Sequence, residues 1–119
     1  INRNIEKTWK PLHDNPEFPA YPSGHAVFGA VSATILEHHF GKLYAFTDNS
    51  HQNRLEFKSS GRSFSSLKDM AIENAYSRFV MGVHFKEDCE EGLKLGYEVG
   101  KQINKIHPDS LLNKKYTLL

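Results

Sequence analysis

Cysteine pairs, a surplus of charge of one sign and long apolar runs are all missing from this sequence of 119 residues. Its single cysteine, Cys89, excludes an internal disulfide framework. The net charge is only +1, so the clustered basic face of a general nucleic-acid binder is not expected. No apolar run approaches the roughly 20 residues that a membrane helix needs. We therefore expect a protein with no nucleic-acid partner and no transmembrane segment.

Strand patterns are missing as well. No stretch alternates apolar and polar residues for any length, whereas apolar residues recur at helical spacing. The spacing predicts helices over about residues 23–40, 65–83 and 87–106, and shorter helices within residues 1–10 and near Leu43. We predict an all-α fold, a helical bundle, with the whole chain, residues 1–119, forming one small domain.

Capping residues mark the predicted helix ends. Ser23 is placed to accept a hydrogen bond at the start of the first long helix, and Gly41 is placed to end it. Ser66 and Asp69 fit a capping box at the start of the second. These positions fix the helix boundaries more sharply than the apolar spacing does.

Each long helix has an apolar face that we expect to be buried. The faces are Val27, Ala30, Val31, Thr34 and Ile35; then Ile72, Ala75, Tyr76, Phe79, Val80 and Val83; then Leu93, Tyr97 and Gly100 beside Leu95, Val99 and Ile103. In the last helix, Gly92, Gly96 and Gly100 recur every fourth residue. Small residues at this spacing let another helix backbone come close; the alternative is a stretch that merely forms helix poorly.

The predicted start of the first long helix has the properties of an anion site. Ser23, Gly24 and His25 lie where unpaired backbone N–H groups and the helix dipole favour anions. Gly24 has no side chain to block a tetrahedral ligand, and Ser23 adds a hydroxyl. His25 is placed to act on the same ligand as an acid or base. Taken alone, this tripeptide is more often an ordinary serine cap than a site.

A second group of polar residues follows far downstream. Arg78 lies off the apolar face of its helix, and its planar guanidinium suits an oxyanion. His84 comes six residues later, and Asp88 four beyond it. Asp88 is in range to accept a hydrogen bond from Nδ1 of His84, which leaves the other ring nitrogen as a basic lone pair. Singly, Arg78 and Asp88 are more often surface charges, and His84 is compatible with a core histidine.

The two motifs together resemble a known superfamily. The motifs are Pro22-Ser23-Gly24-His25 upstream and Ser77-Arg78, five residues, His84, three residues and Asp88 downstream. This order is similar to that of the superfamily uniting type 2 phosphatidic acid phosphatases, bacterial class A acid phosphatases and vanadium-dependent haloperoxidases. Residues 18–29, 73–78 and 82–85 resemble the haloperoxidase branch, and the resemblance covers about residues 9–40 and 65–102.

The resemblance implies a catalytic role for three side chains. His84 would coordinate the vanadium of a bound vanadate, the implied cofactor, whereas the matching histidine of the phosphatases is the nucleophile and needs no cofactor. His25 would act as acid and base on the apical oxygen, or protonate the leaving group of a phosphoester. Asp88 would orient His84.

The resemblance also implies an oxyanion cradle and a halide pocket. Arg78, Ser23 and the backbone amide of Gly24 would hold the equatorial oxygens. Phe18 matches the position where chloroperoxidases carry a phenylalanine beside the halide pocket and bromoperoxidases tend to carry histidine.

Three functions stay open on these residues. The first is a vanadate-dependent haloperoxidase that oxidises halide with hydrogen peroxide. The second is an acid phosphatase acting on phosphomonoesters or lipid phosphates through a phosphohistidine. The third is an inactive fragment that binds oxyanions. The first two take small-molecule substrates, and the resemblance favours a periplasmic or secreted location.

One motif of the superfamily is missing. A lysine, six residues and Arg-Pro would supply further cations for the oxyanion, but Arg3, the only arginine before residue 23, has no proline after it. We therefore expect the chain to be the C-terminal portion of a longer protein. A partial bundle exposes apolar faces, so we also expect self-association or association with the missing portion.

Overall fold

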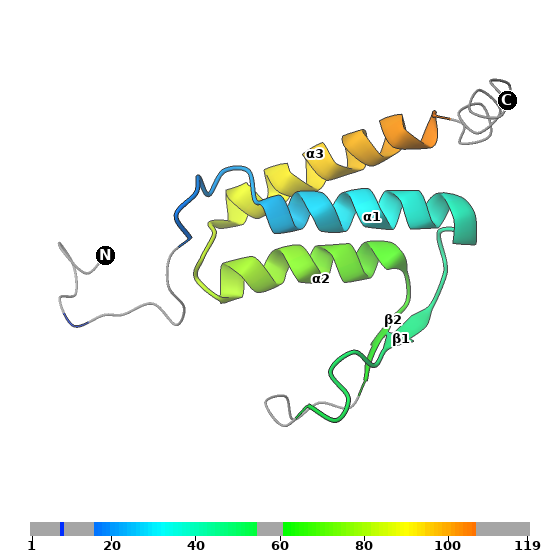
Figure 1. Ribbon diagram of the computed structural model, residues 1–119, viewed down its shortest axis with the longest axis horizontal. Coiled ribbons are helices and arrows are strands. Elements are labelled where there is room, and N and C mark those ends of the chain that lie inside the picture. Colours follow the sequence, from blue (N-terminus) through cyan, green and yellow to red (C-terminus); the bar gives the residue numbers. More distant parts are fainter. Residues whose placement is uncertain (1–7, 9–15, 55–60, 107–119) are drawn as a thin grey trace, which may run out of the picture.

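Three helices make up most of the structured chain. The computed structural model describes residues 8, 16–54 and 61–106. The helices, α1 (Gly24–Phe40), α2 (Leu67–Val80) and α3 (Lys86–Asn104), lie side by side, with α1 against both of the others (Figure 1). They confirm the predicted all-α helical bundle and the three long helices to within about two residues at most ends. The expected helix within residues 1–10 falls almost entirely outside the described residues.

A short hairpin replaces the helix expected near Leu43. Strands β1 (Phe46–Asp48) and β2 (Arg62–Phe64) pair antiparallel between α1 and α2, and residues 41–45 contain no helix. The rings of Phe46 and Phe64 stack with centroids 5.4 Å apart. The prediction was wrong because the pairing joins residues far apart in sequence, and strands of three residues are too short to show alternation.

The predicted serine caps and the glycine stop are present, but only the serine half of the predicted capping box is formed. The Ser23 hydroxyl accepts the backbone N–H three residues on at 3.5 Å, and Gly41 ends α1 with a φ of 91°, a conformation that glycine adopts without strain. The Ser66 hydroxyl accepts the N–H of Asp69 at 3.1 Å. The Asp69 carboxylate hydrogen-bonds with the neighbouring Ser65 hydroxyl. Sequence-local chemistry therefore fixed the start of both helices.

Close contact between α1 and α3 depends on the three glycines of α3. A Cβ added at Gly92 would lie 2.7 Å from the carbonyl oxygen of Ser23, and one at Gly100 would lie 2.6 Å from Cβ of Thr34. One at Gly96 would overlap the carbonyl oxygen of Val27. These contacts confirm that the glycines admit a neighbouring backbone, and they rule out the alternative of a merely poor helix.

The side chains at the helix contacts are small. The buried apolar residues are Ala26, Ala30, Ala33, Leu67, Ala71, Ala75 and Cys89. Small side chains let backbones approach, and buried helix contacts of this kind rely on close packing of many atoms. The core is therefore thin and tightly packed.

The larger apolar residues lie mostly outside this core. On α2, Ile72, Tyr76, Phe79 and Val80 are 42–65% exposed, and only Ala75 of the predicted face is buried. That part of the prediction was wrong because the face of α2 with Ala71 and Ala75 packs on α1. The face with the large apolar side chains points away from α1.

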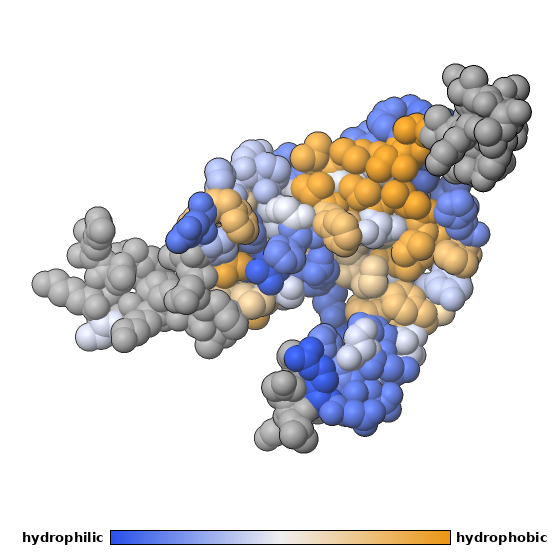
Figure 2. All heavy atoms as spheres, in the orientation of Figure 1, coloured by the Kyte–Doolittle hydropathy of each residue, from blue (hydrophilic) through white to orange (hydrophobic). Residues whose placement is uncertain are grey.

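In α3, too, the small residues are buried and the larger apolar residues are exposed. Leu95, Val99 and Ile103 are exposed. Hydrophobic surface is visible over α3 and its border with α1 (Figure 2). Among the described residues, no helix combines the length and hydropathy needed to cross a membrane. The expectation of self-association stays a prediction.

Replacing Gly96 by alanine should destabilise the protein by about 1–3 kcal/mol, because the added methyl has to displace α1. Without that contact, the same change in a helix would stabilise by up to about 1 kcal/mol. Urea denaturation of the purified protein measures the difference. Gln102→Ala, on the exposed side of the same helix, should change the free energy of unfolding by less than about 0.5 kcal/mol. A Gly96→Ala variant as stable as the parent would contradict the proposed contact.

Candidate functional site

The two sequence motifs meet at one end of the bundle. The backbone N–H of Ser23, just before α1, donates to the carbonyl oxygen of Asp88 in the first turn of α3 at 2.9 Å. Ser23 is fully buried at this contact. Residues 65 positions apart are thus joined by a backbone hydrogen bond, and the helix start that carries Gly24 and His25 lies against the start of α3.

Three cationic or titratable side chains share this end. His25 lies in the first turn of α1, Arg78 in the last turn of α2, and His84 in the connection between α2 and α3. The pKa of His25 is lowered by partial burial, and then by the positive charges of Arg78 and His84. The two motifs therefore lie at the same end of the bundle. That His25, Arg78 and His84 bind one ligand stays a prediction.

Asp88 lies against His84. Its Oδ2 atom is 3.4 Å from Nδ1 of the imidazole, and both side chains are nearly buried, at 9% and 4% exposure. The same oxygen accepts a hydrogen bond of 2.9 Å from the backbone N–H of Phe85. The carboxylate is therefore fixed by the backbone and faces the ring, although the direct hydrogen bond expected from Nδ1 is not formed. Catalytic hydrogen bonds are often long before a ligand binds.

Unsatisfied polar atoms mark the site. In the described part of the chain, Nε of Arg78 and Nδ1 of His84 are buried and lack a hydrogen-bond partner. Another nitrogen of the Arg78 guanidinium contacts the sulfur of Met81 at 3.3 Å, a weak acceptor. Buried donors without partners are costly. An anion beside Arg78 would satisfy Nε, whereas Nδ1 of His84 faces the Asp88 carboxylate.

Gly24 presents open backbone at the same place. A Cβ added there would meet no atom within 4 Å, so the first amide of α1 is accessible. The Ser23 hydroxyl is buried and accepts as the helix cap, and its predicted role as a further oxyanion donor stays a prediction. The Ser23 cap fixes the start of α1. The next two residues of the motif, Gly24 and His25, are exposed to solvent.

Phe18 lies beside His84. Together with Pro16, Ala20 and Val83, these two residues line a cavity of about 150 Å³. Apart from the imidazole, the lining is apolar. The structure thus places the predicted halide-pocket residue next to the predicted vanadium ligand, although the two are 66 positions apart.

Two further residues support the site and were not predicted. The side-chain amide of Asn74 donates to the carbonyl oxygen of His25 at 2.9 Å, one helical turn before Arg78. The Cys89 thiol is buried next to the Ser23 hydroxyl, and burial, followed by the charge of Asp88, raises its pKa. Asn74 lies one helical turn before Arg78, which could have marked it as a site residue. Its hydrogen-bond partner, the His25 carbonyl, lies 49 positions upstream, so the contact itself could not be predicted.

The arrangement suits an oxyanion. It offers a guanidinium, an open helix N-terminus and two imidazoles around one place, which are the groups that bind anions with several oxygens. Among the described residues, no three His, Cys, Asp or Glu side chains converge as ligands of a metal cation.

Comparisons with known proteins agree with this chemistry. Residues 2–111 match the family model described as the VCPO second helical-bundle domain. The chain is 30% identical over 91 residues to a vanadium-dependent bromoperoxidase of Ascophyllum nodosum, covering 69% of the chain and 16% of that protein. It is 28% identical over 107 residues to a vanadium chloroperoxidase of Curvularia inaequalis, covering 62% of the chain and 18% of that protein.

A solved structure shares the fold. It is described as the first bacterial vanadium-dependent iodoperoxidase, with a TM-score of 0.78 and 36% identity. The match covers 90% of this chain and 25% of that one. The chain thus spans about a sixth of the length of the curated relatives it matches.

Removing the guanidinium of Arg78 should raise the pKa of His25 toward its ordinary value of 6.5, because a nearby positive charge disfavours the imidazolium. An NMR titration, with the His25 signal assigned from a His25→Gln variant, measures the shift in Arg78→Ala. Arg62→Ala is the matched control: Arg62 is paired with Glu73 and should leave the midpoint unchanged. An unchanged midpoint in Arg78→Ala would mean that the two groups do not share a site.

The same shift predicts how stability depends on pH. The folded state holds His25 with a lowered pKa, so below pH 6.5 the unfolded state binds the proton more readily. The contribution of His25 to stability should therefore fall as the pH drops from about 6.5 through the folded-state pKa. Thermal melts between pH 7.5 and 5 should show a smaller loss for His25→Gln than for the parent protein. Equal losses would contradict this dependence.

Proposed function

This chain belongs to the family of the VCPO second helical-bundle domain, in the haloperoxidase-like branch, and from that premise we propose that the protein is a vanadate-dependent haloperoxidase. In this reaction hydrogen peroxide, a halide ion and a proton give hypohalous acid and water. The observation that supports it is the convergence of His25, Arg78 and His84 at one end of the bundle. The proposal treats residues 1–119 as one helical catalytic domain of the whole protein.

The residues present fit vanadate. Nε of Arg78 is buried without a partner, and a Cβ on Gly24 would meet no atom within 4 Å, so a donor and space exist for an anion. Arg78, Gly24 and the capped helix start at Ser23 would hold its oxygens, and His84 would bind the vanadium. Vanadate, when bound, supplies a Lewis-acidic centre that makes peroxide a stronger oxidant toward halide.

His25 moves the proton in this proposal. Its lowered pKa keeps the imidazole neutral near pH 7, as a base that takes a proton from incoming peroxide requires. The resulting imidazolium returns the proton to the oxygen that leaves as water. Asn74 anchors the backbone of His25 to α2, which keeps the ring on the side of Arg78.

Asp88 and Phe18 have supporting roles. Asp88, held by the N–H of Phe85, fixes the orientation of the His84 ring. The ring of Phe18 forms part of the small apolar cavity beside His84, which we propose as the halide site. Burying an unpaired charge is costly, so a halide in this cavity would depend on the His84 imidazole as its one polar neighbour in the lining.

The charge of vanadate requires more cations than this chain supplies. Arg78 is the one arginine that the motifs bring to the site, and the sequence lacks the Lys and Arg-Pro motif of the superfamily. Because the chain spans about a sixth of its curated relatives, we propose that the remaining cations come from another part of the whole protein. Electrostatic stabilisation is usually the largest catalytic contribution, so these cations should be needed for full activity.

The phosphatase and the inactive oxyanion binder are the alternatives on the same residues. A phosphatase would use His84 as nucleophile, with no cofactor. The relatives reported above all have vanadium in their names, which favours the halide reaction. An assay with p-nitrophenyl phosphate separates the two: hydrolysis that His84→Ala abolishes, with no bromination, would identify a phosphatase.

Replacing His84 by alanine should abolish vanadate binding and lower bromination by at least about a hundredfold, because the vanadium loses its protein ligand. Binding is measured as the rise in melting temperature with vanadate, and activity as peroxide-dependent bromination of phenol red by the whole protein. His39→Ala, an exposed histidine at the far end of α1, is the control and should match the parent. No rise in the melting temperature of the parent protein with vanadate would contradict oxyanion binding and leave only a structural role.

A further inference from the structure

A methionine contacts the arginine of the oxyanion site. The sulfur of Met81 lies 3.3 Å from Nη1, one of the terminal nitrogens of the Arg78 guanidinium. A thioether is a weak hydrogen-bond acceptor. Nε of the same guanidinium is buried with no hydrogen-bond partner among the residues that the structure describes. The acceptor that Arg78 meets here is thus a sulfur atom whose hydrogen-bonding strength changes when it is oxidised.

The backbone fixes this contact. Met81 is the C-cap of α2, three residues after Arg78, and residues at that spacing lie on one face of a helix. Its backbone N–H donates to the carbonyl oxygen of Ser77 at 3.0 Å. Gly82 follows with a φ of 74°, which favours glycine, and its N–H donates to the carbonyl oxygen of Phe79 at 2.9 Å. The turn after α2 therefore holds Met81 beside Arg78.

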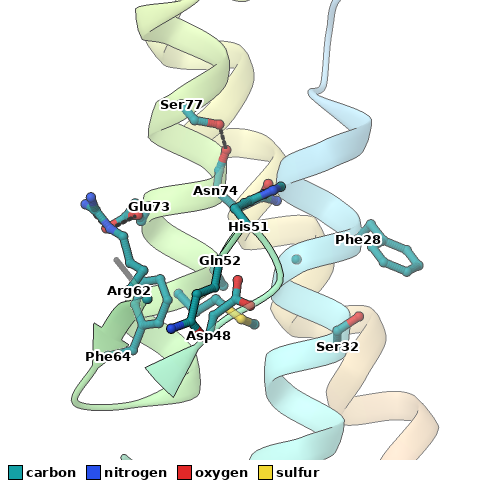
Figure 3. Close-up of a pocket in the computed structure, with 14 residues that line it drawn as sticks. Phe28, Ser32, Asp48, His51, Gln52, Arg62, Phe64, Glu73, Asn74 and Ser77 are labelled. Carbon is teal, nitrogen blue, oxygen red and sulfur yellow. Dashed lines mark hydrogen bonds and ion pairs between the residues drawn. The ribbon is translucent and has the colours of Figure 1, made fainter. Parts of the chain in front are cut away.

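The other two sulfur-containing residues lie in different surroundings. The chain has two methionines and one cysteine. Met70 precedes Arg78 by eight residues, about 12 Å along the helix axis. It lines a separate cavity of about 530 Å³ between α1, α2 and the hairpin (Figure 3). The Cys89 thiol is buried with a raised pKa, so it stays protonated and reacts poorly with oxidants. Of the two methionines, Met81 is the one beside the oxyanion site.

Oxidation changes what Met81 offers to Arg78. Met81 is only partly buried, so a small oxidant can reach its sulfur. Methionine sulfoxide is polar, and its oxygen is a better acceptor than a thioether. That oxygen would be bonded to a sulfur already 3.3 Å from Nη1, and hydrogen bonds to charged groups are the strong ones. An oxyanion would then have to displace the sulfoxide before it could bind the guanidinium.

We propose that Met81 is an oxidation site through which the product of the reaction weakens anion binding at Arg78. The proposal rests on the haloperoxidase function, which forms hypohalous acid beside Arg78. In the oxidation step the sulfur gives two electrons to the halogen, which leaves as halide. The oxygen of the hypohalous acid becomes bonded to the sulfur, and its proton passes to water. Methionine sulfoxide reductases reverse this modification.

Added hypobromous acid tests the effect of oxidation without turnover. The whole protein is treated until mass spectrometry shows Met81 as the sulfoxide, and the rise in melting temperature with vanadate gives the affinity before and after. The parent and the matched control Met70→Leu should bind vanadate about ten- to a hundredfold more weakly after oxidation, the effect of one hydrogen bond to a charged group. Met81→Leu, given the same dose, should show no such change. Methionine sulfoxide reductase should restore binding in the parent.

NMR of the guanidinium tests the contact without vanadate. The Nε–H signal of Arg78, assigned by its loss in Arg78→Lys, should shift when Met81 is oxidised and should stay in place in treated Met81→Leu. A signal that does not move in the oxidised parent, or a vanadate affinity that falls equally in Met81→Leu, would overturn the proposal. A parent protein with no vanadate response before oxidation would contradict the oxyanion site, and the NMR shift would still decide the contact.

Turnover separates this proposal from the function on which it rests. While the protein oxidises bromide with peroxide, the ratio of Met81 to Met70 oxidation should be at least about fivefold higher than with added hypobromous acid, because the oxidant forms beside Arg78. Bromination without this bias toward Met81 would overturn the feedback by product. Absence of bromination in the parent would overturn the haloperoxidase function, and the experiments with added oxidant would still decide whether Met81 acts on Arg78.

Discussion

The contact between α1 and α3 is the constraint on which the site depends. Three glycines remove the side chains that would separate the two helices, and the backbone of Ser23 then reaches the carbonyl oxygen of Asp88. This brings the α1 N-terminus, which carries His25, beside the start of α3, which His84 precedes. A residue with a side chain at Gly92 would push Ser23 away, and the two motifs would no longer meet there.

The contact between α1 and α2 completes the arrangement in a similar way. Gly29 leaves room for Asn74, whose amide nitrogen would lie only 2.9 Å from a Cβ at that position. Asn74 uses this room to bind the carbonyl oxygen of His25, and Arg78 follows one turn later. The small residue Gly29 thus affects the site directly, because it lets the Asn74 side chain of α2 reach the backbone of α1.

The same small residues leave bulky apolar side chains on the outside. Amphipathic faces that a periodicity argument assigns to the core, such as Tyr76 and Phe79 on α2, are exposed in the described part of the chain. Hydrophobic surface gathers over α3 as well (Figure 2). A family member that spans about a sixth of its curated relatives is expected to keep faces that pack against other parts of a whole protein.

The sequence by itself determined the helices, their caps and the chemistry of the two motifs, because hydrogen bonds to Ser23 and Ser66 and helical spacing act within a few residues. It could not determine which face of each helix is buried, because burial depends on where the neighbouring helix packs. In the structure, the faces with alanine and glycine are the ones in contact. The hairpin was likewise decided by tertiary structure. Its pairing joins Phe46 to Phe64, and two strands of three residues each are too short for a local pattern to encode that contact.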